Sequence, residues 1–151
     1  MTLHALIRVV QPDDLNALVE LCAAHAAYER APYDPANKAP RLAADLFATR
    51  PKLYGLVVEQ EGSLVGYATY MRQYATWDAA DYIYLDCLYL KPEARGMGLG
   101  RQLMQRIQQE GRKLGCTLIQ WQTPDFNTRA IQFYTRLGAT SKAKERCFLE
   151  I

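Results

Sequence analysis

The feature that most constrains this chain is a glycine-rich turn between a strand-like run and an amphipathic helix; it reads Arg95-Gly96-Met97-Gly98-Leu99-Gly100. Glycine lets a backbone turn tightly and approach a ligand closely, because it carries no side chain. The start of the following helix presents unpaired N–H groups and a partial positive charge. Arg95 and Arg101 add full charges at the rim. The turn therefore predicts a pyrophosphate site, and the alternative left open is a turn that only caps the helix.

Two common phosphate-binding motifs do not fit this turn. The P-loop needs Gly-x-x-x-x-Gly-Lys-Ser/Thr, and the sequence contains no such run. The dinucleotide pattern Gly-x-Gly-x-x-Gly also fails, because Gly98-Leu99-Gly100 is followed by Arg101-Gln102-Leu103. Nor does the turn follow the first strand of a βαβ unit, where the dinucleotide-binding fold places it. These motifs therefore do not name the ligand.

Hydrophobic periodicity divides the chain into strands and helices. Short runs of β-branched and aromatic residues predict strands at 6–10, 54–60, 64–72, 82–90 and 117–123, with a closing strand at 146–151. Apolar residues at helical spacing predict helices from Pro12 to near Tyr28, over 41–48, from Leu99 to before the capping Gly115, and over 128–137. The turn Glu61-Gly62-Ser63 between two strands is a hairpin signal. Since a hairpin rules out a wholly parallel sheet, we expect an α/β fold with a mixed, mostly antiparallel twisted sheet and helices on both faces.

Length and composition describe one ordinary globular domain. The 151 residues contain no repeat, linker or low-complexity segment, so we expect a single domain over 1–151. No apolar run approaches the ~18 residues of a membrane helix, and no signal peptide is evident, so we expect a cytoplasmic protein without a membrane partner. The four cysteines should be buried, reduced thiols, and their spacing predicts no metal site. The net charge of +2 forms no basic stripe, so no nucleic-acid partner is expected.

The turn also matches a family signature, Arg/Gln-x-x-Gly-x-Gly/Ala of the GNAT superfamily of N-acetyltransferases. The stretch from Asn127 to Ala139 is similar to that family's second signature, Asn-x-x-Ala-x-x-Phe-Tyr-x-x-x-Gly-Ala. The run 83–90 resembles the strand that precedes the turn in the family. Within the superfamily the chain most resembles the diamine (spermidine/spermine) acetyltransferase branch, through Ala27-Tyr28-Glu29, the stretch from Tyr74 to Trp77, and Tyr84-Leu85-Asp86. The likeness covers residues 6–151 and implies a GNAT fold that moves an acetyl group from acetyl-CoA to an amine.

The resemblance implies which residues hold acetyl-CoA, the co-substrate. Its pyrophosphate would lie on the turn and the helix start, which supply Arg95, Gly96, Met97, Gly98, Leu99, Gly100 and Arg101. Leu88 and Leu90 would act through backbone groups on a strand splayed from its neighbour, bonding the pantetheine arm and polarising the acetyl carbonyl. Asn127 either only caps the following helix or also touches the pantetheine arm or a bound water, and the sequence leaves both open.

Tyr134 and Asp86 are the candidates for proton transfer. Tyr134 lies in an amphipathic helix, where a tyrosine is often simply part of the core. The resemblance makes it the general acid that contacts the cofactor and protonates the departing thiolate, and an ordinary tyrosine pKa of about 10 suits a donor at neutral pH. Asp86 stands among apolar strand residues. It either faces solvent, pairs with an arginine, or, as the resemblance implies, binds the amine and helps to remove its proton through water.

The acceptor site implied by the diamine branch contains Tyr28, Glu29, Trp77 and Asp86. Two acids of that branch are missing, since Ala75 and Cys87 stand where aspartates are expected. The chain therefore lacks an extended anionic track for a long polyamine, unless Asp78 or Asp81 replaces an anchor. We expect a compact amine as the acceptor.

The expected function is thus an acetyl-CoA-dependent N-acetyltransferase that acts on a primary amine of a small molecule by direct attack in a ternary complex. Three alternatives stay open: an acetyltransferase for a protein or peptide amine, a non-catalytic acyl-CoA-binding sensor, and an unrelated nucleotide-binding protein. A homodimer is expected from the family likeness alone. The identity of the acceptor amine does not follow from the sequence.

Overall fold

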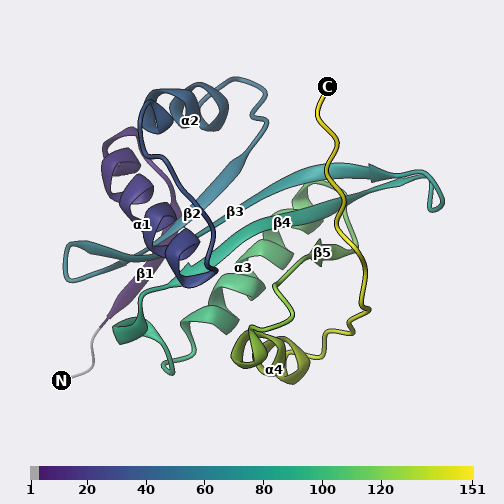
Figure 1. Cartoon of the computed structure of the whole chain (residues 1–151). Coiled ribbons are helices and arrows are strands. Elements are labelled where there is room, and N and C mark those ends of the chain that lie inside the picture. The colour runs from purple at the N-terminus through teal and green to yellow at the C-terminus, as the bar shows by residue number, and fades with distance from the viewer. Residues whose placement is uncertain (1–3) are drawn as a thin grey trace.

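A single five-stranded sheet organises the computed structural model, which describes residues 4–151. Its strands, in spatial as well as chain order, are β1 (Ala5–Val9), β2 (Tyr54–Gln60), β3 (Ser63–Ala75), β4 (Ala80–Leu90) and β5 (Ile119–Trp121). The first four pair antiparallel, and β5 pairs parallel to β4. Figure 1 shows β3 and β4 as a long twisted hairpin across the molecule. The mixed, mostly antiparallel sheet expected from the sequence is confirmed.

Helices cover both faces of the sheet, as expected. They are α1 (Leu15–Tyr28), α2 (Lys38–Leu46), α3 (Leu99–Lys113) and α4 (Thr128–Arg136), and the 3₁₀ turns η1 (Pro12–Asp14) and η2 (Pro92–Ala94) precede α1 and α3. Figure 1 shows α1 and α2 on one side of the sheet and α3 on the other. Their buried apolar side chains pack on the sheet in two cores, one on the face covered by α3 and one on the face covered by α1 and α2.

The two cores are built from alternate residues of the same strands. Val57 of β2 faces α1, where it packs with Leu18 and Leu21. Its neighbours Leu56 and Val58 face α3 instead. Both faces of the central strands are therefore apolar, which explains why these strands read as nearly continuous hydrophobic runs in the sequence.

Several element boundaries differ from those expected. The closing strand expected at 146–151 is wrong, because residues 139–151 form no helix or strand. The strand expected at 117–123 is shorter than expected and spans only Ile119–Trp121 (β5), because β4 pairs with it only from Ile83 to Leu85. In contrast, β3 and β4 extend further than expected because they pair with each other up to Ala75 and Ala80. α2 begins at Lys38, three residues earlier than expected.

The four cysteines are all unpaired. Cys116 is buried as expected, whereas Cys22 and Cys87 are half-buried and Cys147 is exposed. The expectation of a buried thiol was wrong at Cys147, because the strand that would have contained it does not form. No helix within residues 4–151 is long and apolar enough to cross a membrane.

An ion pair fastens the start of α1 to the sheet. Asp14 is only 9% exposed, and its two carboxylate oxygens accept hydrogen bonds from Arg8 Nη1 at 2.7 Å and Nη2 at 2.9 Å. The backbone N–H of Gln11 donates to the same carboxylate at 2.7 Å. The Arg8 guanidinium holds the pKa of Asp14 below its usual value, although burial opposes this shift.

We expect Asp14→Asn to lower the free energy of unfolding near pH 7 by about 1.5–3 kcal/mol, because an amide cannot accept both charged hydrogen bonds. The pKa of Asp14 is lower in the folded chain than in the unfolded one, so its contribution is complete above the unfolded pKa of about 3.9 and is lost as the pH falls through the folded pKa. Urea unfolding near pH 7 and near pH 2 should therefore separate the variant from wild type only at the higher pH. Asp13→Asn, at an exposed neighbour, is the control. An equal loss of stability at both pH values would contradict the ion-pair explanation.

Candidate active site

β4 and β5 separate partway along the sheet. Their pairing runs only from Ile83 with Ile119 to Leu85 with Trp121, although β4 continues to Leu90. Beyond Leu85, no described strand pairs with this side of β4. The splayed strands expected from the family resemblance are therefore present, and the backbone of β4 is accessible between them.

The backbone groups of Leu88 and Leu90 face this separation. The Lys91 N–H donates to the carbonyl of Val65 on the β3 side at 2.8 Å. In an antiparallel ladder, residues that bond the partner strand alternate with residues whose N–H and C=O face away. Leu88 and Leu90 therefore direct these groups away from β3 and toward the separation. The Leu90 carbonyl already accepts a hydrogen bond from Arg95 Nε at 2.9 Å, which leaves Leu88 as the better candidate to bind a ligand.

The glycine-rich turn follows directly after β4 and η2. Gly96 and Gly98 have φ angles of +78° and +81°, in the left-handed region that other residues rarely adopt. A Cβ added at either position would meet no atom within 4 Å, so the space beside the turn is open. Gly98 is the N-cap of α3 and supplies no side chain to it, so the first N–H groups of the helix remain available to an anion.

Gly100, the third glycine of the turn, serves packing. A Cβ on Gly100 would lie 2.9 Å from Cζ of Phe133 on α4, so any larger residue would have to displace the Phe133 ring. The glycine therefore lets the start of α3 and the middle of α4 come together. The sequence alone did not predict this contact between α3 and α4.

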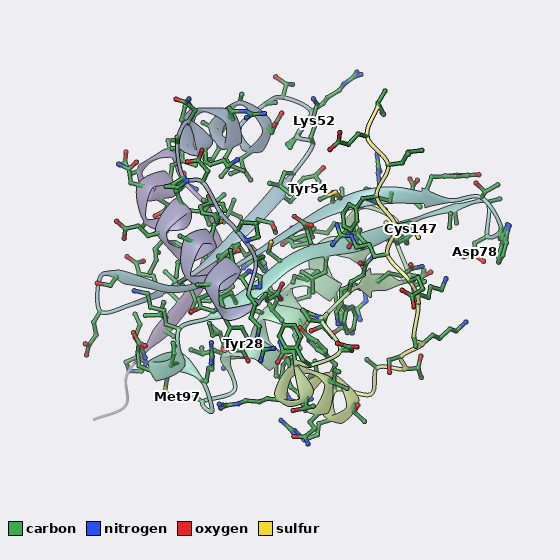
Figure 2. All side chains as sticks on the ribbon, viewed as in Figure 1. Tyr28, Lys52, Tyr54, Asp78, Met97 and Cys147 are labelled. Atoms are coloured by element: carbon green, nitrogen blue, oxygen red, sulfur yellow. The ribbon has the colours of Figure 1, made fainter. Side chains whose placement is uncertain are left out.

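Arg95 points back onto the end of α1 instead of standing at the rim. Its guanidinium carbon lies 4.7 Å from the ring centroid of Tyr28 and 5.6 Å from that of Tyr89. Together with its bond to Leu90, this arrangement ties β4, the turn and α1 into one unit. Arg101 is exposed in the first turn of α3, and Met97 is 45% exposed at the tip of the turn, where Figure 2 labels it.

Tyr134 is half-buried on α4, beside the end of β5. Its ring packs edge-on against Trp121, with centroids 5.1 Å apart. Burial, together with the nearby charge of Glu29 and the neighbouring Tyr28, raises the pKa of Tyr134 to about 12. The hydroxyl is therefore protonated at neutral pH, as a proton donor must be.

A hydrogen bond between Tyr28 and Asn127 joins the end of α1 to the start of α4. Tyr28 Oη donates to Asn127 Oδ1 at 3.2 Å, and the same oxygen accepts the Ala130 N–H at 3.3 Å. The second bond makes Asn127 the N-cap of α4, which is one of the two roles left open by the sequence. Figure 2 shows Tyr28 where α1 ends above α4.

Glu29 is held by a histidine that sequence reasoning missed. Glu29 Oε1 lies 3.1 Å from His25 Nε2, and His25 Nδ1 lies 2.8 Å from the hydroxyl of Tyr67 on β3. The His25 ring also stacks on Tyr89, with centroids 5.2 Å apart. This chain of contacts orients the Glu29 carboxylate. The charge of Glu29 contributes, after burial, to the raised pKa of Tyr134. The sequence did contain a signal for this pair: His25 and Glu29 are four positions apart, a spacing that puts two side chains on one face of a helix.

Asp86 is the extra residue of a β-bulge in β4. Thr69 pairs with Cys87 and Tyr70 pairs with Leu85, so Asp86 has no partner across the ladder. A bulge redirects a side chain out of the regular alternation, and bulges are common beside active sites. The Asp86 carboxylate is exposed, and Cys87 Sγ lies 3.8 Å from its Oδ2.

The two candidate acids act on different neighbours. The charge of Glu29 adds to the effect of burial in raising the pKa of Tyr134. Asp86 lies near the half-buried thiols: burial, with the charge of Asp86 in support, raises the pKa of Cys87 to about 12 and also raises that of Cys22. The two carboxylates thus come from different elements, Glu29 from the end of α1 and Asp86 from β4.

The fold does not place Trp77 beside the other expected acceptor residues, Tyr28, Glu29 and Asp86. It lies in the turn between β3 and β4 and is fully exposed, at 101%. Figure 2 shows the adjacent Asp78 at the tip of the hairpin, far across the view from Tyr28. Asp81, the other possible replacement anchor, lies 3.5 Å from Arg72 in an ion pair. The extension of β3 and β4 carries all three residues outward.

The described residues fit a long ligand that has a pyrophosphate at one end. The glycine turn offers an open, electropositive cradle, the separated edge of β4 offers backbone groups, and a protonated tyrosine lies beside that edge. Acetyl-CoA has this form. Within residues 4–151, no group of three or more His, Cys, Asp or Glu residues could hold a metal ion.

Comparison with known proteins agrees with this geometry. Residues 17–139 match the acetyltransferase (GNAT) family. The thialysine N-epsilon-acetyltransferase of Bos taurus is 31% identical over 142 residues, which cover 89% of this chain and 83% of the relative. The spermidine/spermine N(1)-acetyltransferase-like protein 1 of Homo sapiens is 28% identical over 111 residues, or 69% of this chain and 16% of the relative.

A solved structure shows the same fold. An aminoglycoside N-acetyltransferase in complex with CoA matches with a TM-score of 0.83 over 99% of this chain and 97% of its own, at 18% identity. The resemblance drawn from two short motifs is confirmed over most of the chain, including its likeness to the diamine branch. The chain belongs to the GNAT family of acetyltransferases.

Proposed function

We propose that this enzyme transfers an acetyl group from acetyl-CoA to the primary amine of a compact small molecule. The observation that carries the proposal is the contact of the Tyr134 ring with Trp121, the residue of β5 at which its pairing with β4 ends. Burial raises the pKa of Tyr134 to about 12, which suits a proton donor at neutral pH. The glycine turn lies at the far end of the same β4 edge and would hold the pyrophosphate through Gly96, Met97, Gly98, Leu99 and Gly100. Arg101, exposed in the first turn of α3, would add positive charge there, whereas the Arg95 side chain is already held by Tyr28 and the Leu90 carbonyl.

The proposed step is a direct attack in a ternary complex. Asp86, through water, removes a proton from the ammonium, and the neutral nitrogen forms a bond to the acetyl carbon. The backbone N–H of Leu88 donates to the carbonyl oxygen, where negative charge develops. As the carbon–sulfur bond breaks, Tyr134 gives its proton to the departing sulfur. The acylated nitrogen then gives its extra proton, through water, to the tyrosinate, so that a neutral amide and a free thiol are formed and Tyr134 is restored. Asn127 would steady the pantetheine arm or a water beside it.

The two thiols nearest the site do not suit a covalent route. Burial raises the pKa values of both Cys22 and Cys87, the latter to about 12. At neutral pH both are therefore thiols, whereas a nucleophilic cysteine reacts as the thiolate. This supports direct transfer rather than an acetyl-cysteine intermediate. We also propose that the enzyme is cytoplasmic, which the absence of disulfides among its four cysteines supports.

The acceptor would lie between Glu29 and Asp86, with the ring of Tyr28 at its side. Two acids can bind one ammonium group, but they cannot bind the several ammonium groups of a long polyamine. Ala75 and Cys87 occupy the positions of the missing acids, and Trp77 lies out on the hairpin. A relative that acts on thialysine, an amino acid with a side-chain amine, agrees with a compact acceptor.

We expect kcat/KM for a lysine-like amino acid or a short amine to exceed that for spermine by about tenfold or more. Each charged hydrogen bond is worth about 1.5–3 kcal/mol, and about 1.4 kcal/mol changes an equilibrium tenfold, so even one missing anchor gives this factor. Steady-state release of CoA thiol across lysine-like amines, short diamines and spermine measures it, and the KM for acetyl-CoA serves as the internal control. A clear preference for spermine would overturn the compact acceptor and would point to Asp78 or Asp81. If no amine releases thiol although acetyl-CoA binds, the enzyme assignment itself fails for this chain.

A further inference from the structure

His25, in the last turn of α1, is enclosed by its own helix and by two strands of the sheet. Its Nδ1 lies 2.8 Å from the hydroxyl of Tyr67 on β3, and its Nε2 lies 3.1 Å from Oε1 of Glu29 at the end of α1. The ring stacks on Tyr89 of β4 with 20° between the two planes, and it meets the Tyr67 ring edge-on with centroids 5.7 Å apart. Only 12% of the His25 side chain is exposed. Packing therefore fixes the ring, and both of its nitrogens have partners.

The partners of the two nitrogens determine which of them carries the proton in a neutral ring. An ionised carboxylate only accepts hydrogen bonds, so the bond to Glu29 requires a hydrogen on Nε2. Nδ1 then has a free electron pair, to which the Tyr67 hydroxyl donates. Burial raises the pKa of Tyr67 far above its usual value, so this hydroxyl keeps its proton. The hydrogen bonds therefore run in one direction, from Tyr67 through His25 to Glu29.

The Glu29 side chain depends on this bond for its orientation. Glu29 is the C-cap of α1, and its side chain is 33% exposed. Within residues 4–151, His25 is the only side chain that forms a hydrogen bond or an ion pair with it. That bond engages Oε1 and leaves Oε2 for a ligand. The carboxylate also contributes, after burial, to the raised pKa of Tyr134, so it lies within electrostatic reach of the proposed proton donor.

We propose that His25 is a positioning residue for the acceptor: its Nε2–H holds Oε1 of Glu29, so that Oε2 is presented to the ammonium group of the amine. This role rests on the proposed function, because it assigns His25 to the binding of that amine. Ordering a flexible side chain at the moment of binding weakens affinity by about two- to tenfold, a loss that a carboxylate already held in place avoids. Both nitrogens of His25 are engaged, so the residue acts on the acceptor through Glu29 and does not itself take the proton of the amine.

Replacing His25 by the two amide residues separates its bond to Glu29 from its bond to Tyr67. In His25→Asn the amide would lie near the place of Nδ1, within reach of Tyr67 but short of Glu29. In His25→Gln the longer side chain would carry an N–H near the place of Nε2, where it can donate to Glu29. Both variants lose the stacking on Tyr89, so they form a matched pair.

We expect His25→Asn to raise the KM for a short amine by about two- to tenfold, with a smaller change in kcat and none in the KM for acetyl-CoA. His25→Gln should restore most of the wild-type KM for the amine. Steady-state release of CoA thiol measures all three constants. A wild-type amine KM in His25→Asn, or an equal rise in both variants, would overturn the proposal.

A double-mutant cycle with Glu29→Ala tests whether His25 acts through Glu29. In the Glu29→Ala chain, His25→Asn should not raise the amine KM further, because the carboxylate that His25 holds is absent. A general effect of His25 on the packing of α1 would raise the amine KM in both backgrounds by the same factor. That result would contradict the positioning role.

Nitrogen NMR of the histidine rings tests the bond to Glu29 without turnover. The chain contains only two histidines, His4 and His25, so the signals that disappear in His25→Asn belong to His25. We expect Nε2 of His25 to carry a proton at neutral pH, and an unprotonated Nε2 would overturn the proposal even in an active enzyme. If Nε2 is protonated but wild type releases no CoA thiol with any amine, the proposed function fails instead, and the role of His25 in binding the acceptor fails with it.

Discussion

Tyr134→Phe is expected to lower kcat by about 10²–10⁴-fold, the range for loss of a general acid. The substitution keeps the ring and its edge-on contact with Trp121 and removes only the hydroxyl. Burial raises the pKa of that hydroxyl to about 12, so the variant would lose the group proposed to protonate the departing sulfur. The affinity for acetyl-CoA, measured by calorimetry, should change far less than kcat.

The matched control for this variant is Tyr70→Phe. Burial raises the pKa of Tyr70 to about 12, as it does for Tyr134, but Tyr70 belongs to the core beneath α3. Loss of the Tyr70 hydroxyl should change the free energy of unfolding and leave kcat nearly unchanged. Wild-type turnover in Tyr134→Phe would show that water or another group protonates the thiolate. An equal loss of kcat in both variants would mean that the effect is structural.

The second large effect is expected for Gly98→Glu, which should abolish the rise in melting temperature that acetyl-CoA produces. A ligand that binds only the folded state raises the Tm, so loss of binding removes the rise. The new side chain would enter the open space beside the turn and place a negative charge at the start of α3, where the pyrophosphate would lie. Thermal unfolding with and without acetyl-CoA measures this directly.

Gly62→Glu separates loss of the ligand from strain in the backbone. Gly62 has a φ of +78°, close to the +81° of Gly98, and a Cβ there also meets no atom within 4 Å. It lies in the turn between β2 and β3, away from the glycine-rich turn. Both variants should lose a similar amount of stability, but only Gly98→Glu should lose the response to acetyl-CoA. An undiminished response in Gly98→Glu would show that the turn only caps the helix.

The sequence by itself determined most of the framework. Periodicity located all five strands and all four helices to within a few residues, because each presents a regular apolar stripe or run. It also predicted a sixth strand, at 146–151, that does not form. The two signatures identified the family before any fold was known, and the family match confirms them. Local signals also sufficed for Asn127, whose capping bond depends only on residues three positions away.

Tertiary structure alone decided how the site is assembled. The bulge that leaves Asp86 unpaired depends on the register between β3 and β4, and no short window of sequence encodes that register. The contact of Gly100 with Phe133 and the bond of Tyr28 to Asn127 join elements far apart in the chain. His25 acquires its partner Tyr67 only when α1 packs on the sheet.

The end of the chain, residues 140–151, shows the same limit most clearly. The composition of 146–151 correctly marks a run that favours a strand, but a strand is stabilised only by a neighbour. Within residues 4–151 no strand pairs with this run, so the predicted strand is not formed, and Cys147 is exposed. Local propensity states what a segment can become, whereas the pairing that makes it a strand is a long-range contact, and only the packed structure determines which contacts of this kind exist.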